Sequence, residues 1–266
     1  MSKTSRSEER RSAELERPEP GKIREMFDDI AGSYDRLNDL MTAGLHHRWR
    51  DMGVMLAKVG PGSSALDVCC GTGDFAFALR RAIGPEGRVV GADVSEEMLK
   101  IAREKSGRNQ LYVEFMQGDV LELPFPDGGP AASASSGSAG SRTGRGPAGF
   151  DACTVGFGIR NVADITRAFG EMRRVCRPGG RVVCLEITQP HIPVFKQFYK
   201  VWFDFAVPRL GKLAARDEEA YRYLPASVKR FPAPDELKRL MEEAGLKSVH
   251  YELLAGGIIA LHHGVA

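Results

Sequence analysis

The chain has 266 residues, 42% of them hydrophobic, which is enough to bury a sizeable core. A net charge of +2 is too balanced to indicate a nucleic-acid partner. No uninterrupted apolar run is long enough to cross a bilayer, and five cysteines without a C-x-x-C pair indicate neither a disulfide framework nor a zinc site. These features favour a reducing, cytoplasmic location.

The N-terminal part of the chain divides into a polar tail and a helical segment. Residues 1–21 mix Ser, Arg and Glu with few apolar positions, which predicts a disordered tail. Residues 22–266 are expected to form one domain, and residues 22–60 within it to form an N-terminal helical cap. That cap either packs on the domain or closes over a substrate as a lid. Its apolar positions have helical spacing: Ile23, Met26, Phe27 and Ile30.

The stretch from Ser64 to Asp74 is the corner on which the rest of the chain is organised. Its nearly unbroken apolar residues, up to Cys70, predict a strand buried on both faces. Gly71 and Gly73 then permit a tight turn and a close approach of backbone to a ligand. A helix is expected to begin at Asp74. A strand, a glycine turn and a helix in this order indicate the nucleotide-binding corner of a doubly wound α/β domain.

Charge separates two interpretations of this corner. Residues 71–76 also satisfy the dinucleotide pattern G-x-G-x-x-A, which leaves a dinucleotide-dependent oxidoreductase as an alternative. A pyrophosphate would be repelled by the carboxylates of Asp67 and Asp74. A ligand that carries an ammonium and a sulfonium would be attracted by them. The sequence therefore favours S-adenosylmethionine over a dinucleotide.

Two further aspartates are expected at the same edge of the sheet. Asp93 ends the next apolar strand, 22 positions after Gly71 (93 − 71), which is the spacing of an acid that binds a ribose diol. A capping role belongs more naturally to Ser95, which precedes Glu96 and a helical pattern. Asp119 follows a third strand and is either a ligand of the adenine amino group or a plain turn residue. The sequence leaves both roles of Asp119 open.

The second half of the chain continues the pattern around an insertion. Residues 128–149 consist almost entirely of Gly, Ala, Ser, Pro and Arg and are expected to form a flexible surface loop. Residues 193–210 carry aromatic residues at helical spacing, which indicates core or lid packing, an apolar wall for a long substrate, or a membrane-facing surface. The other predicted elements are strands at 111–116, 150–155, 181–187, 247–254 and 257–262, a turn at 177–180, and helices at 165–176 and 234–244.

His46 and His47 are adjacent, but the sequence offers no third metal ligand near them. We therefore predict no metal site.

From Lys22 to Gly264 the chain resembles the C-methyltransferases of ubiquinone and menaquinone biosynthesis. The segments Phe-Gly-Ile-Arg-Asn (157–161) and Tyr-Leu-Pro (223–225) carry the most specific part of the resemblance. Further matches lie at 26–27, 34–38, 49–50, 67–74, 123–125, 177–181, 231–232 and 256–258. The resemblance implies a class I S-adenosylmethionine-dependent methyltransferase fold, Rossmann-like, with a mainly parallel seven-stranded sheet.

The resemblance also implies a donor site. The family's contacts with S-adenosylmethionine fall on Thr72, Asp93, Asp119 and Val120. A further contact in some members falls on Gly156, where this chain lacks their serine hydroxyl. Together with three residues of the glycine corner, Asp67, Gly71 and Gly73, these make up the predicted donor site.

The implied reaction is methylation of a ring carbon of a prenylated naphthoquinol, with a prenylated methoxy-benzoquinol as the alternative. Arg160 would stabilise a phenolate and Asn161 would orient its oxygen, while Tyr34 and His46 are candidates for proton handling. A structural ion pair with Glu186 is the alternative for Arg160. A prenylated substrate implies transient contact with a membrane surface, and a homodimer is left open. A non-catalytic protein that binds the donor is the remaining alternative.

Overall fold

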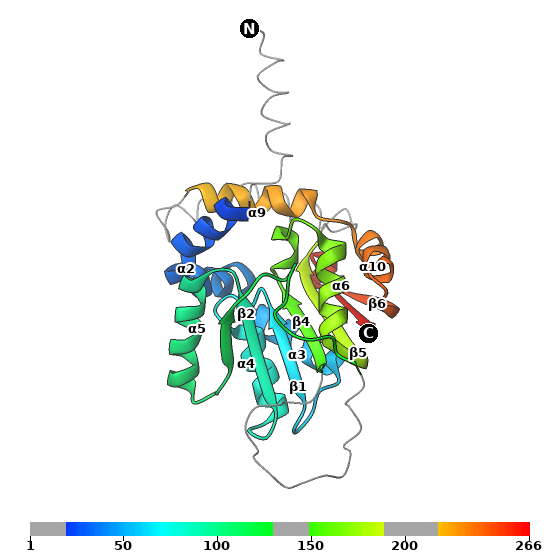
Figure 1. Ribbon diagram of the computed structural model, residues 1–266. Coiled ribbons are helices and arrows are strands. Elements are labelled where there is room, and N and C mark those ends of the chain that lie inside the picture. The colour runs from blue at the N-terminus through cyan, green and yellow to red at the C-terminus, as the bar shows by residue number, and fades with distance from the viewer. Residues whose placement is uncertain (1–19, 130–148, 189–217) are drawn as a thin grey trace, which may run out of the picture.

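A computed structural model describes residues 20–129, 149–188 and 218–266 (Figure 1). The tail, the low-complexity insertion and the aromatic segment at 193–210 lie wholly or largely outside these residues, so they stay predictions. The described elements are α2 (Pro20–Thr42), α3 (Leu45–Ala57), β1 (Ser64–Val68), α4 (Asp74–Ile83), β2 (Arg88–Asp93), α5 (Glu96–Asn109), β3 (Glu114–Gln117), β4 (Phe150–Gly156), η1 (Ile159–Asn161), α6 (Ile165–Val175), β5 (Cys176–Ile187), α9 (Glu218–Arg230), α10 (Pro234–Glu243), β6 (Lys247–Leu254), η3 (Ala255–Gly257) and β7 (Ile259–Val265).

The strands form one sheet in the order β3-β2-β1-β4-β5-β7-β6. The five strands from β3 to β5 are parallel, whereas β7 runs antiparallel to both of its neighbours, so the sheet is mainly parallel as expected. The chain proceeds outward from β1 to β3 and then returns to place β4 against the other side of β1. Ligands of open α/β sheets bind at the carboxyl ends of the strands at such a reversal.

Alternate residues of β1 enter two separate cores. Leu66 and Val68 pack in the core that contains Phe169 of α6, and Ala65 packs in the core that contains Phe75 of α4. Every residue of β1 is buried, which explains its near-continuous apolar sequence. In Figure 1, α6 and α10 lie in front of the sheet, while α3 and α4 lie behind it.

The two N-terminal helices have different roles. α3 packs against α4, β4 and β5, with Trp49 and Val54 in the shared core, so it is one layer of the domain. α2 instead contacts α5 and α9 and lies at the end of the sheet where α9 crosses (Figure 1). Of the two interpretations of the helical cap, packing therefore applies to α3, and the lid interpretation stays a prediction for α2.

Several predicted boundaries differ from the structure, among them the first helix, which begins at Pro20 inside the predicted tail, and the last strand, which spans Ile259–Val265 and not 257–262. β1 ends at Val68, because Cys69 has a left-handed backbone with φ of 50° and cannot continue the strand. β3 begins three residues later than position 111, because the Leu111 N–H still bonds to a carbonyl of α5. The predicted turn at 177–180 is a bulge within β5, where pairing jumps from Cys176 to Arg181.

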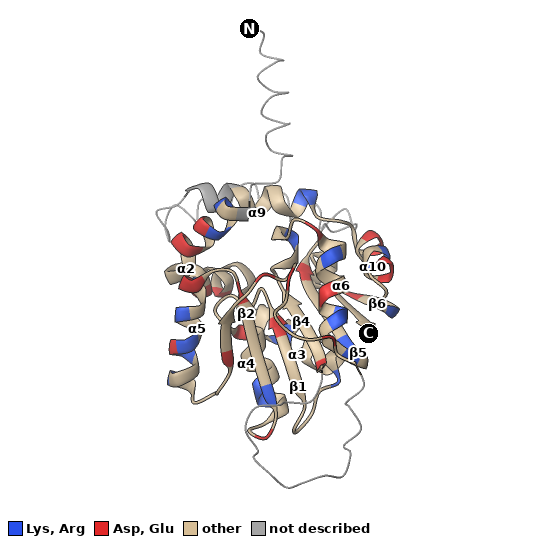
Figure 2. Cartoon of the chain, in the orientation of Figure 1, with Lys and Arg blue, Asp and Glu red and all other residues tan. Residues whose placement is uncertain are grey.

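Among residues 20–129, 149–188 and 218–266, the structure has no helix that is both long and apolar enough to cross a membrane. Figure 2 shows acidic and basic residues interspersed along α5 and α10. Several of them pair within their own helix, as Lys100 does with Glu97 and Arg239 does with Glu236. Pairing of this kind is typical of solvated helix faces.

Candidate active site

A cavity of about 340 Å³ opens under α2 at the carboxyl ends of β1 to β4. This volume lies within the range of small-molecule sites. Half of the twelve predicted site residues line it: Tyr34, Gly71, Asp93, Asp119, Val120 and Asn161. The other half, all described, lie outside its lining: His46, Asp67, Thr72, Gly73, Gly156 and Arg160. The cavity is also lined by residues that were not among the predicted site residues. Most of these are apolar, and they include Ile23, Phe27, Cys69, Met98, Phe157 and Val162.

The glycine loop takes its shape from two left-handed residues. Gly71 and Gly73 have φ of 52° and 88°, a region in which residues with a Cβ are strained. A Cβ on Gly73 would also lie 2.8 Å from the ring of Phe115. The loop therefore requires glycine at position 73 for two independent reasons, and it brings the backbone of Gly71 to the cavity.

Asp93 joins three segments at the cavity. Its Oδ2 accepts the N–H of Gly71 at 2.8 Å, and its Oδ1 accepts the N–H of Ser95 at 2.9 Å. Burial raises the pKa of Asp93, and these hydrogen bonds oppose the rise. Ser95 caps α5, as the sequence predicted, because its Oγ accepts the N–H of Met98. The ribose role of Asp93 stays a prediction that its place in the cavity wall supports.

Asp119 makes the turn contact that was one of the two roles left open, and its place in the cavity wall supports the other, which stays a prediction. Its Oδ1 accepts the N–H of Leu121 at 2.9 Å, which is turn chemistry, and the residue also lines the cavity beside Val120. Val120 is buried and gives this part of the wall an apolar surface. An acid next to an apolar wall suits an adenine, because the face of the ring is apolar and its amino group can donate a hydrogen bond to the acid.

The charge argument for the donor needs a correction. Asp74 does not face the cavity as a free carboxylate, because its Oδ1 lies 2.6 Å from Lys105 Nζ and its Oδ2 lies 3.8 Å from Arg50. Burial alone would raise the pKa of Asp74, but these two cations hold it below its usual value. Among the described residues, the acids that do line the cavity are Asp93 and Asp119. They supply the negative charge that was assigned to Asp67 and Asp74.

Asp67 and Gly156 do not line the cavity and can affect it only through the residues that they contact. Asp67 is buried on the side of the sheet that faces α3 and α4, and it accepts the hydroxyl of Thr154 at 2.7 Å from the neighbouring strand. Burial raises the pKa of Asp67 to about 7, although the hydrogen bond from Thr154 acts to lower it. At Gly156 a Cβ would lie 2.9 Å from the ring of Phe75, so a side chain here requires that ring to move.

Tyr34 and Asn161 also line the cavity, and Tyr34 lies close to the glycine loop, with a ring atom 3.9 Å from where a Cβ on Gly71 would stand. Tyr34 is on α2, and burial raises the pKa of its phenol. Asn161 ends η1, and its Oδ1 accepts the hydroxyl of Tyr223 from α9 at 2.9 Å. The prediction of site residues omitted Tyr223, although it begins the specific Tyr-Leu-Pro segment. That segment was the signal that would have identified it.

Arg160 lies behind this wall in a buried ion pair. Its Nη1 is 2.8 Å from Glu186 Oε1 and also donates to the carbonyl of Phe157. Burial alone would lower the pKa of Arg160, but Glu186 keeps it above its ordinary value. The ion pair that the sequence offered as an alternative therefore exists. Arg160 also acts electrostatically on Tyr34 and Tyr223, and it favours the ionised form of both phenols.

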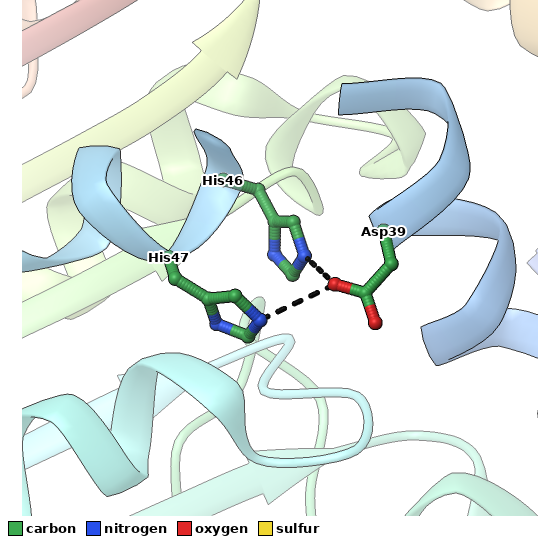
Figure 3. Close-up of side chains that lie close together, drawn as sticks. All are labelled: Asp39, His46 and His47. Carbon is green, nitrogen blue, oxygen red and sulfur yellow. Dashed lines mark hydrogen bonds and ion pairs between the residues drawn. The ribbon is translucent and has the colours of Figure 1, made fainter. Parts of the chain in front are cut away.

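His46 is 2% exposed, and both of its ring nitrogens have partners, of which Figure 3 shows Asp39. Nε2 donates to Asp39 Oδ1 at 2.8 Å, and Nδ1 accepts from Arg50. His47 Nε2 lies 3.3 Å from the same Asp39 oxygen. A metal would require the lone pair of Nε2, which would move the proton to Nδ1, against the guanidinium of Arg50. This hydrogen bonding disfavours a metal at Asp39, His46 and His47.

Several solved structures with this architecture are methyltransferases. A methyltransferase from Aquifex aeolicus has a TM-score of 0.58 at 17% identity, covering 87% of this chain and 97% of its own. One from Thermotoga maritima has a TM-score of 0.55 at 19% identity, covering 91% and 98%. The [4+2]-cyclase SpnF has the same fold, with a TM-score of 0.55 at 16% identity, covering 94% and 97%. Fold alone therefore does not specify the reaction.

The sheet order and the glycine loop are those of the class I S-adenosylmethionine-dependent methyltransferase fold. A sequence model of the ubiE/COQ5 methyltransferase family matches residues 15–136 and 138–266, and the chain belongs to this family. Relatives include a demethylmenaquinone methyltransferase of Staphylococcus carnosus, 42% identical over 92% of this chain and 93% of its own. A Staphylococcus aureus enzyme of the same name is 43% identical over 91% and 92%.

We predict that Asp67→Asn stabilises the protein progressively as the pH rises from 4 to 7. The unfolded chain loses the Asp67 proton near pH 4, whereas the native state keeps it up to about pH 7. The native state therefore binds more protons in this window, and the wild-type protein loses stability as the pH rises. The amide has no such proton, so the variant should gain roughly 4 kcal/mol relative to wild type at pH 7. Urea unfolding at pH values from 4.5 to 8 measures this, and a pH-independent difference would contradict it.

Proposed function

We propose that the protein transfers the methyl group of S-adenosylmethionine to a ring carbon of demethylmenaquinol, a prenylated naphthoquinol. The observation that carries the proposal is the match to demethylmenaquinone methyltransferases over more than nine tenths of both chains. The family assignment replaces the dinucleotide-dependent oxidoreductase that the glycine pattern left open. A prenylated methoxy-benzoquinol, as in ubiquinone biosynthesis, is the alternative acceptor.

On the donor side, Gly71, Asp93, Asp119 and Val120 support binding of the nucleoside and the sulfonium. The two carboxylates attract the cationic donor and would disfavour an anionic pyrophosphate. Thr72 is 1% exposed, and its hydroxyl donates to Asp35, so its contribution to the donor site is indirect. Gly73 and Asp67 do not line the cavity either, so their contribution is likewise indirect.

The acceptor side combines apolar walls with a few polar groups. The apolar walls are formed by Phe27, Ile23 and Phe157. They suit an aromatic ring with an isoprenoid chain, and they help to exclude water during methyl transfer. In the reaction, the ring carbon forms a bond to the methyl carbon while the bond from methyl to sulfur breaks, leaving S-adenosylhomocysteine. The quinol hydroxyl loses its proton before attack, and the methylated carbon loses its proton afterwards to restore aromaticity.

Three residues are proposed to manage the charge and the protons of the acceptor. Asn161 orients the quinol oxygen, and Tyr34 donates a hydrogen bond, because its raised pKa keeps it protonated at neutral pH. Arg160 stays protonated and therefore acts through its field and not as a base. His46, fixed between Asp39 and Arg50, is better suited to hold α2 against α3 than to exchange protons with a substrate.

A methyl-transfer assay with labelled S-adenosylmethionine tests the acceptor. We expect label to enter a chemically reduced demethylnaphthoquinol and to require the reduced form, because only the quinol supplies a nucleophilic carbon. A methoxy-benzoquinol is assayed in parallel as the comparison acceptor. Label in both acceptors would mean that the enzyme has a wider acceptor range. If neither acceptor is labelled although the donor binds, the proposed acceptor is wrong.

We predict that Tyr223→Phe lowers kcat by about tenfold, the effect of one lost hydrogen bond in the transition state, and leaves the Kd for the donor unchanged. The phenol holds the amide of Asn161, which lines the acceptor side. Tyr112→Phe is the control, because Tyr112 is 74% exposed and far from the cavity lining. Equal kcat values for the two variants would show that Tyr223 does not position Asn161 for catalysis.

We further propose a cytoplasmic enzyme that contacts the membrane surface transiently, because a prenylated acceptor resides in a bilayer. Liposomes of anionic lipid that contain the demethylnaphthoquinone should carry part of the protein upward in a flotation gradient. The same liposomes without the quinone are the control. A protein that stays entirely in the soluble fraction under both conditions contradicts the proposal. Assembly into a homodimer stays a prediction.

A further inference from the structure

Lys105 is a nearly enclosed cation on α5 that the proposed donor and acceptor contacts do not use. Its Nζ lies 2.6 Å from Asp74 Oδ1, 2.8 Å from Asp35 Oδ2 and 3.2 Å from Thr72 Oγ1. The side chain is only 17% exposed. Three acceptors account for all three N–H donors of an ammonium group. Lysine is usually a solvated surface residue, so this arrangement needs an explanation.

The three partners come from segments that are far apart in the sequence. Asp35 is on the lid helix α2, Thr72 is in the glycine loop, and Asp74 begins α4. Lys105 lies 70, 33 and 31 positions from them. The Thr72 hydroxyl also donates to Asp35 at 2.5 Å, so the four residues form one connected group, the Lys105 cluster. The cluster joins the lid directly to the loop that approaches the donor.

A second contact fixes the same face of α2. Asp28 and Asp35 are seven positions apart, which places them on one face of a helix. Asp28 Oδ1 accepts the hydroxyl of Ser95 at 2.5 Å, at the start of α5. Tyr34 lies beside Asp35 and lines the cavity. The position of Tyr34 over the glycine loop therefore depends on the carboxylate anchors of α2.

The charges of the cluster depend on Lys105. Asp35 and Asp74 both lie within 2.8 Å of the same nitrogen, so without it two carboxylates would face each other with no cation between them. Arg50, 3.8 Å from the other oxygen of Asp74, would neutralise only that acid. Lys100 offers a contrast on the same helix, because its pair with Glu97 is exposed and contributes little.

We propose that Lys105 is a positioning residue for donor binding, which holds α2 and the glycine loop in the one arrangement that accepts S-adenosylmethionine. The hydroxyl of Thr72 acts through the Lys105 cluster and not by direct contact with the donor. The inference rests on the proposed donor but not on the proposed acceptor. Donor binding tests it even if the methylation assay fails.

The first experiment compares Lys105→Met with Lys100→Met in the full-length protein. Calorimetric titration with S-adenosylmethionine should show a Kd at least tenfold higher for K105M and changed by less than twofold for K100M. Amides of α2 should exchange hydrogen faster in K105M, because the lid has lost one of its anchors. A K105M protein that binds the donor within twofold of wild type overturns the proposal.

Two further variants separate electrostatic positioning from a loss of packing. Asp35→Asn in the K105M background removes the unpaired carboxylate and should recover part of the donor affinity. Thr72→Val should weaken donor binding in the wild-type background but add little to K105M, because both act through one cluster. Additive effects of T72V and K105M, or no recovery with D35N, would overturn the proposed role. If K105M does not fold, Asp35→Asn alone should still speed exchange in α2, and unchanged exchange would count against the cluster.

Discussion

The buried carboxylate of Asp93 is the junction on which the rest of the site depends. It receives one N–H from the glycine loop and one from the start of α5, so the end of β2 fixes both neighbouring segments. Hydrogen bonds to a charged group contribute about 1.5–3 kcal/mol each, which matters for a loop built from left-handed glycines. Such a loop has many backbone conformations of similar energy. Asp93 selects the conformation in which the Gly71 backbone lines the cavity.

Around this junction the acids divide into two sets with opposite environments. Asp93 and Asp119 line the cavity, whereas Asp35 and Asp74 are paired with Lys105 behind the loop. The second set links the glycine loop to α2, and its two charges are balanced there by Lys105 and Arg50. The first set is left to face the cavity in which we propose that the cationic donor binds. In that proposed site, this division surrounds a sulfonium with acids without placing several unpaired carboxylates next to one another.

The order of strands and helices could be predicted because burial controls it: strands covered on both faces are continuously apolar, and glycine turns separate them from amphipathic helices. The ends of elements were less certain, since Cys69 is as apolar as a strand residue yet has a left-handed backbone. The charges of the site could not be read from spacing. Nothing in the sequence around Asp74 shows that a lysine 31 positions away neutralises it, or that burial raises the pKa of Asp67. The partners of His46 could not be read from the sequence for the same reason, because Arg50 and Asp39 occupy both of its nitrogens only in the folded chain.

The Arg160–Glu186 pair shows how a structural contact and a catalytic role can coincide. A guanidinium 2.8 Å from a fully buried carboxylate acts on the cavity as a dipole, weaker than a free cation but fixed in direction. Arg160 favours the ionised forms of the Tyr34 and Tyr223 phenols, and Glu186 opposes it at Tyr223. A fixed dipole needs no reorganisation when a phenolate forms, which is the condition for effective electrostatic stabilisation. The ion pair is therefore compatible with the proposed role of Arg160 in the reaction, because it fixes the orientation of the guanidinium.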